Sequence, residues 1–174
     1  MSKSDFVNEF QKSIVEYIRY IIYEDWGYDN LEVNPEKMPT DDWSGLPDVW
    51  IGEKASSRHQ RKPKIVCIEI EHKSGYGQAL KNINHVIKWV KSTKKNRGAL
   101  LHLIHSDSNL TENKLDIVLM HGIKARGKRF AYDFRIYDIK NLTKSKAEAK
   151  DKVASSDFRW ALWQQLAFVK LVKH

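Results

Sequence analysis

The fold is decided by two neighbouring stretches, Leu46-Pro47-Asp48-Val49-Trp50-Ile51-Gly52 and Ile65-Val66-Cys67-Ile68-Glu69-Ile70-Glu71-His72-Lys73. Both are short apolar runs rich in β-branched residues and bounded by Gly or Pro, which is typical of β-strands. In the second run, charges alternate with apolar residues, so Glu69, Glu71 and Lys73 are expected on one side of the strand. Charges on so apolar a strand are costly to bury unless they are paired or hold a metal ion. This conflict between composition and burial is the main functional signal in the sequence.

The flanking sequence predicts alternating helices and strands. A helix is expected from about Ser4 to Trp26, because apolar residues recur at helical spacing and Gly27 follows as a stop signal. A short strand is expected at 31–33. The later elements predicted are a helix from the turn at 74–77 to about residue 90, a strand at 99–105, a helix at 109–126, an edge strand at 129–137, a solvated helix or linker at 140–152, and a helix at 156–174.

Length and composition indicate one soluble globular domain. The chain has 174 residues, with 41% hydrophobic and 30% charged residues. The single cysteine, Cys67, lies within an apolar strand and is expected to be inert packing. No apolar run is long enough to cross a bilayer, and the first residues lack the pattern of a secretory signal, so we expect a cytoplasmic protein with no membrane partner. The net charge of +8 favours polyanionic partners.

The order of elements resembles that of the PD-(D/E)XK nuclease-like superfamily. It runs helix, strand, a strand headed by Pro-Asp, a strand with alternating acids and a lysine, helix and strand. The matching residues are Pro47-Asp48 and Glu69-Ile70-Glu71-His72-Lys73, and the resemblance covers about residues 5–107. It implies an α/β fold with a restriction-endonuclease-like core, a central mixed sheet flanked by helices in the order αβββαβ. Residues 109–174 would add a strand and a C-terminal helical extension to a single domain of residues 1–174.

The chemistry of such a site follows from the residue types. Hydrolysis of a phosphodiester needs a divalent cation that offsets charge on the phosphate and activates water. Mg²⁺, or Mn²⁺ in its place, prefers carboxylate oxygens. The resemblance implies a metal-dependent DNA endonuclease in which Asp48, Glu69 and Glu71 hold the cation. Lys73 would orient the water or stabilise the developing charge.

Two registers of the motif are open. In one, Asp48, Glu71 and Lys73 fill the superfamily pattern literally. In the other, Asp48 and Glu69 are the acids and Glu71 takes the usual lysine position, which leaves Lys73 beyond the end of the strand. We favour the second register, because it keeps apolar Ile70 between the two active residues. A structural alternative is that Glu69 and Glu71 lie on an exposed sheet face and pair with Lys or Arg.

Further side chains are candidates for accessory roles. Members of the superfamily often add a glutamate from the first helix, here Glu16 or Glu9, although for each of them alone an ordinary solvated helix glutamate is the better explanation. Gln78, one turn into the second helix, would reach the site from the side. The histidines do not form a metal site, because His102 and His105 are three apart on a strand and therefore face opposite sides.

Basic residues gather in or beside predicted loops, where they would contact DNA phosphates. They are Arg58, Arg61, Lys62 and Lys64, then Lys91, Lys94, Lys95 and Arg97, and finally Lys124, Arg126, Lys128 and Arg129. One alternative to the nuclease is a nucleic-acid-binding module that retains the fold without catalysis. Another is an interaction domain whose acids form salt bridges. A homodimer is one arrangement that would cover the apolar surface of the tryptophan-bearing C-terminal helix.

Overall fold

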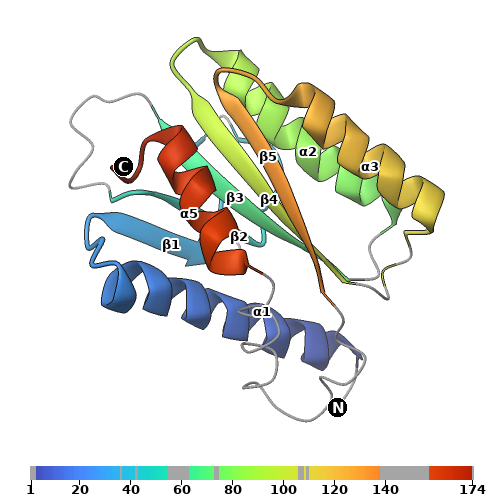
Figure 1. Ribbon diagram of the computed structural model, residues 1–174, viewed down its shortest axis with the longest axis horizontal. Coiled ribbons are helices and arrows are strands. Elements are labelled where there is room, and N and C mark those ends of the chain that lie inside the picture. Colours follow the sequence, from blue (N-terminus) through green and yellow to red (C-terminus); the bar gives the residue numbers. More distant parts are fainter. Residues whose placement is uncertain are drawn as a thin grey trace.

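The fold is a five-stranded mixed sheet with helices on both faces (Figure 1). The computed structural model describes residues 3–35, 37–41, 43–54, 63–72, 75–105, 108, 110–137 and 157–173. Its elements are α1 (Lys3–Arg19), the π-helical segment η1 (Tyr20–Asp25), β1 (Leu31–Pro35), β2 (Val49–Glu53), β3 (Lys64–Glu71), α2 (Tyr76–Ser92), β4 (Arg97–His105), α3 (Glu112–Ala125), β5 (Phe130–Tyr137) and α5 (Phe158–Val169). The α/β class and the order αβββαβ, followed by a strand and a C-terminal helix, are as predicted.

The strands lie in the order β1-β2-β3-β4-β5. The pairs β1–β2 and β2–β3 are antiparallel, whereas β3–β4 and β4–β5 are parallel. Each parallel connection contains a helix, α2 or α3, because a chain must cross back over the sheet before it can add a parallel neighbour. The carboxyl ends of β3, β4 and β5 therefore meet at one end of the sheet.

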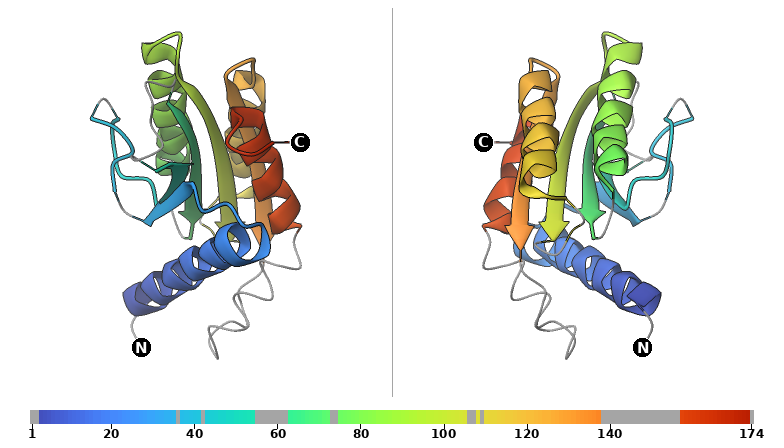
Figure 2. Two further views of the ribbon diagram at one scale, coloured as in Figure 1. Left: turned by 90° about the vertical axis from the view of Figure 1, so that its left-hand side faces the viewer. Right: turned by 90° about the vertical axis from the view of Figure 1, so that its right-hand side faces the viewer.

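Helices cover both faces of the sheet (Figures 1 and 2), and a hydrophobic core lies beneath them on each face. On β3, Val66, Ile68 and Ile70 face α1 and α5, whereas Ile65 and Cys67 face α2 and α3. The alternation has period two, as the sequence predicts. All residues of β3 after Lys64 are buried. The charged residues at its end therefore need hydrogen-bond partners or opposite charges inside the protein.

Both edge strands have main-chain carbonyl groups bound by side chains. Arg19 of α1 donates from Nη2 to the carbonyl of Val33 in β1 over 3.2 Å. Arg126 donates from Nε to the carbonyl of Tyr132 in β5 over 2.7 Å. Each edge strand therefore has a main-chain carbonyl group that already accepts a hydrogen bond from a side chain.

The first helix differs from its prediction in one respect. It is α-helical only to Arg19, and η1 then continues to Asp25 before Gly27, whose φ of +67° ends the helical segment as expected. Ile21 and Ile22 of η1 are both buried and continue the core face of α1. The residues between 140 and 152 lie outside the described part of the chain.

The C-terminal helix α5 lies across β3, β4 and β5 on the α1 side. Its inner residues, including Phe158, Leu162 and Leu166, belong to the core of that face. Trp160 points outward with 56% of its surface exposed. Within the described residues, no helix combines the length and the apolar character that a membrane span requires.

Candidate functional site

The Pro-Asp element and the acidic strand meet as the resemblance implies. The antiparallel register pairs Val49 with Ile68, so the next position brings Asp48 alongside Glu69. The contact is direct, because the backbone N–H of Ile70 donates to Oδ2 of Asp48 over 2.7 Å. The carboxylate of Asp48 is thus fixed at the carboxyl end of β3.

Glu69 and Glu71 project from the same face of β3, towards α2. Their residues are only 7% and 1% exposed. Both carboxylates accept hydrogen bonds from one amide group: Nδ2 of Asn82 lies 3.2 Å from Oε2 of Glu69 and 2.9 Å from Oε1 of Glu71. The exposed sheet face considered as an alternative is therefore wrong, because α2 covers both acids.

The acids form a cluster of like charges. Burial raises the pKa of Glu69 well above its usual value, and the nearby carboxylates of Asp48 and Glu71 raise it further, while a hydrogen bond involving the backbone of Asp48 acts in the opposite direction. Among the residues that the structure describes, no lysine or arginine acts on this pKa. Burial, followed by the charge of Glu69, also raises the pKa of the Cys67 thiol, which agrees with an inert packing role.

Two further buried polar residues lie behind Glu71. Nε2 of His102, on β4, is 3.6 Å from Oε1 of Glu71. Its other ring nitrogen, Nδ1, is 3.1 Å from the hydroxyl of Tyr132, on β5. His102 has no exposed surface. His105, as predicted, faces the opposite side, where its ring contacts that of His72 with centroids 4.7 Å apart.

The accessory candidates differ in their positions. Gln78 donates from Nε2 to Oδ1 of Asn82 over 2.8 Å, so it reaches the acids through Asn82. Glu16 is an exposed residue of α1. The α1 side chain that reaches the site is instead that of Gln11, which donates to the carbonyl of Asp48 over 3.2 Å. Positions 11 and 16 are about 140° apart around a helix, so both cannot face the site.

Sequence reasoning missed Gln11, Asn82 and the role of His102 and Tyr132. The spacing of Gln78 and Asn82 was a usable signal, because polar residues four apart on a helix are neighbours. His102 gave a second signal, since a polar side chain inside a continuous apolar strand needs a buried partner.

The predicted DNA-binding residues lie away from the acids where the structure describes them. Arg97 pairs with Lys64 and Ile104 with Glu71, so Arg97 lies about 23 Å from the acidic end at 3.3 Å per residue. Lys94 and Lys95 are exposed in the turn before β4. Arg97 is itself bound, because its guanidinium donates to the carbonyl of Phe168 over 2.9 Å. Lys73, Arg58, Arg61 and Lys62 lie outside the described residues.

The donor set suits a hard cation, because three mutually repelling carboxylates come from adjacent strands. The atoms are not yet arranged to hold one: in the described part of the chain, no three His, Cys, Asp or Glu side chains form a metal-binding group. Asn82 holds the two glutamates on the α2 side instead. Binding of a cation would therefore require these side chains to rotate.

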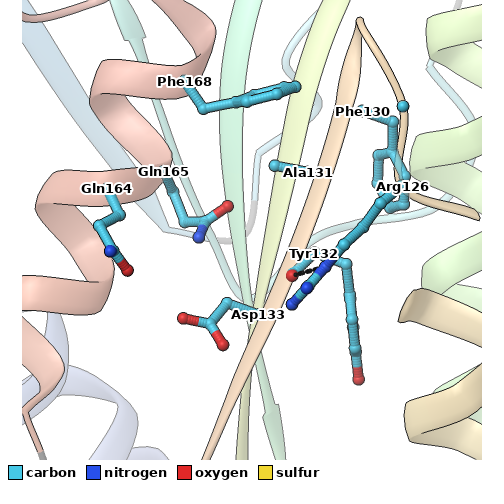
Figure 3. Close-up of a pocket in the computed structure, with 9 residues that line it drawn as sticks. Arg126, Phe130, Ala131, Tyr132, Asp133, Gln164, Gln165 and Phe168 are labelled. Carbon is cyan, nitrogen blue, oxygen red and sulfur yellow. Dashed lines mark hydrogen bonds between the residues drawn. The ribbon is translucent and has the colours of Figure 1, made fainter.

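A separate pocket of about 370 Å³ lies between β5 and α5 (Figure 3). Asp133 and Gln165 line it on one side of β5, whereas the ring of Tyr132 lies on the other side of the strand. The pocket and the acidic cluster thus occupy opposite faces of the sheet, and the pocket meets Tyr132 only along its backbone.

The similarity of this chain to known proteins is slight. No family model and no curated protein matches the chain. Among solved structures, SfsA from Pyrococcus furiosus, in complex with Ca²⁺, is similar over 70% of this chain with 11% sequence identity and a TM-score of 0.39. The matched part spans 55% of the SfsA chain. A TM-score this low assigns neither a function nor a ligand to this chain.

Proposed function

We propose that this chain is a metal-dependent nuclease that hydrolyses phosphodiester bonds in DNA. The observation that carries the proposal is the burial of Glu69 and Glu71 beside Asp48, at one end of the sheet. Burying like charges together is costly, and such arrangements cluster at functional sites, where the charged groups bind a ligand or take part in catalysis. A divalent cation is the simplest group that would neutralise all three.

Each residue then has a defined role. Asp48 and Glu69 would hold Mg²⁺ or Mn²⁺, and Glu71 would be a further ligand or accept a proton from the attacking water. When bound, the cation supplies charge neutralisation at the phosphate and a more acidic water. Lys73 would position that water or stabilise charge on the phosphate. Gln11 holds the backbone of Asp48 in place from α1.

The geometry favours the register with Glu69 and Glu71. Asp48 is level with Glu69 across the β2–β3 pair, and β3 ends at Glu71. Ile70, between the two acids, packs into the core on the other face. Lys73 follows beyond the end of the strand in sequence, as that register requires.

DNA would approach the carboxyl end of β3. Lys12 and Lys81 are exposed and adjoin Gln11 and Asn82 in the chain, so they are our candidates for contacts to phosphates near the acids. Lys94 and Lys95 precede Arg97, which lies about 23 Å along the sheet from the acids, so they would contact a phosphate at least about seven nucleotides away at 3.4 Å per nucleotide. Their contribution is expected to be general affinity, which falls as salt rises.

The decisive experiment is cleavage of supercoiled, linear and branched DNA with Mg²⁺, Mn²⁺ or EDTA, using wild-type protein, Asp48→Ala and Glu69→Gln. We expect cleavage that requires the metal and is lost in both variants. Asp29→Asn is a matched control, because Asp29 is an exposed carboxylate just before β1, at the far end of the sheet. Cleavage that persists in both site variants would show that another group is responsible.

The alternative is a nucleic-acid-binding module without catalysis. Two observations favour it: Asn82 already donates to both glutamates, and the described acids form no ready metal group. Such a module would bind DNA equally well in EDTA and in Mg²⁺, and Asp48→Ala would leave that affinity unchanged. A fluorescence-anisotropy titration in both buffers separates the two functions.

A further inference from the structure

Tyr132, His102 and Glu71 form a buried line across three adjacent strands, β5, β4 and β3. The hydroxyl of Tyr132 is 3.1 Å from Nδ1 of His102, and Nε2 of His102 is 3.6 Å from Oε1 of Glu71. Nε2 has no hydrogen-bond partner within the described residues, although it is fully enclosed. An enclosed ring nitrogen that faces a carboxylate just beyond bonding distance needs an explanation.

His102 and Tyr132 are both neutral near pH 7. His102 has no exposed surface, and burial disfavours the charged imidazolium, so the imidazole carries one proton. Burial, followed by the charge of Glu71, raises the pKa of Tyr132, so the phenol keeps its proton. A neutral imidazole has one donor and one acceptor nitrogen. The direction of the hydrogen bond between Tyr132 and Nδ1 therefore decides whether Nε2, which faces Glu71, is a donor or an acceptor.

The packing fixes the ring of Tyr132. A Cβ at Gly122 of α3 would lie 2.4 Å from Cδ1 and Cε1 of that ring, so the ring rests directly on the helix backbone. The rings of Tyr132 and His102 also meet edge to face, with centroids 5.5 Å apart at 90°. The hydroxyl thus has a defined position next to Nδ1.

We propose that Tyr132 and His102 are positioning residues for Glu71: the Tyr132 hydroxyl donates to Nδ1 of His102 and thereby keeps the ring proton on Nε2, where it faces the carboxylate. The N–H dipole stabilises charge on Glu71 and limits its rotation when it turns from Asn82 to a cation. This inference rests on the proposed function. Partners behind a ligand commonly tune metal affinity in this way.

The test is the affinity for Mn²⁺, measured by electron paramagnetic resonance of the free ion in protein without DNA. Tyr132→Phe removes only the hydroxyl, and we expect it to weaken Mn²⁺ binding about 10-fold. Tyr23→Phe is the matched control, because it removes a tyrosine hydroxyl that is bonded to the carbonyl of Leu31 elsewhere in the fold. It should leave the affinity unchanged.

A double-mutant cycle separates positioning from general packing. His102→Gln keeps an N–H donor near the position of Nε2 but has no tautomer to be set, so Tyr132→Phe should have no further effect in that background. Equal losses from Tyr132→Phe in both backgrounds would overturn the inference. So would wild-type affinity in Tyr132→Phe while wild-type protein binds Mn²⁺.

The wild-type protein offers an independent measurement. The ¹⁵N shifts of His102 report which ring nitrogen carries the proton, and we expect the proton on Nε2. A proton on Nδ1 would overturn the inference whatever the metal affinity. Wild-type protein that binds no Mn²⁺ would instead overturn the proposed metal-dependent function, and this inference with it.

Discussion

Asp48 is tied to the strand of the two glutamates by a hydrogen bond in which the backbone N–H of Ile70 donates to its Oδ2 over 2.7 Å. The residue that donates this bond, Ile70, lies between Glu69 and Glu71 in the sequence. A carboxylate that accepts from a backbone N–H is held without a cation. The side chain proposed as a metal ligand therefore also joins the start of β2 to the end of β3.

This double role predicts different outcomes for two substitutions at Asp48. Asp48→Asn keeps an acceptor for Ile70 but loses the charge, so we expect nearly unchanged stability in EDTA and much weaker Mn²⁺ binding. Asp48→Ala leaves the N–H of Ile70 without its acceptor, and its free energy of unfolding should fall by about 1–3 kcal/mol. Urea titration in EDTA measures the stability, and calorimetric titration measures Mn²⁺ binding. Equal destabilisation by both substitutions would show that charge, rather than the hydrogen bond, matters for the fold.

Glu69→Gln is expected to stabilise the metal-free protein at neutral pH. The pKa of Glu69 in the fold is raised, chiefly by burial, so between the unfolded value of about 4.3 and the folded value the native state binds more protons than the unfolded state. Stability from this group is therefore full below that window and is lost as pH rises through it. The glutamine has no such loss, and its advantage should grow with pH to about 0.5–2 kcal/mol.

The measurement is thermal unfolding of both proteins in EDTA from pH 4 to pH 8. At this chain length, 1 kcal/mol corresponds to about 2–4 °C in Tm. Excess Mn²⁺ should reverse the order, because a ligand that binds only the native state stabilises it by mass action. A pH-independent difference between the two proteins would contradict a raised pKa at Glu69.

Asn82 is expected to substitute for a cation in the metal-free protein. Its amide donates to both glutamates and accepts from Gln78. Asn82→Ala should lower the free energy of unfolding by about 1–3 kcal/mol in EDTA, because buried acceptors lose their donor. The loss should shrink in saturating Mn²⁺, when the cation neutralises the same carboxylates. Asn84→Ala, at an exposed position of the same helix whose amide oxygen contacts His121, is the control and should show equal, small effects in both buffers.

Much of this site was predictable because it depends on local periodicity. The alternation along β3 predicts that Glu69 and Glu71 share a face, and the short antiparallel partner brings Asp48 beside them. The positions of Asn82, His102 and Tyr132 depend instead on which helix covers the sheet and which strands are neighbours. That information is not local. The basic turn at Lys94 and Lys95 illustrates the same limit, because only the parallel pairing of β3 and β4 reveals that it lies at the other end of the sheet.

Trp160 is the residue on which we expect a homodimer to depend. Its ring is stacked on that of Trp163, with centroids 5.3 Å apart and planes at 9°, and it remains 56% exposed. An exposed apolar ring of this size is the kind of surface that a second copy would cover. Trp160→Glu should convert the dimer to a monomer in light scattering after gel filtration, with little change in Tm. Tyr20→Glu, at a similarly exposed aromatic residue of η1, should leave the mass unchanged. A wild-type protein that stays monomeric at 100-fold different loading concentrations would show that the prediction of a homodimer is wrong.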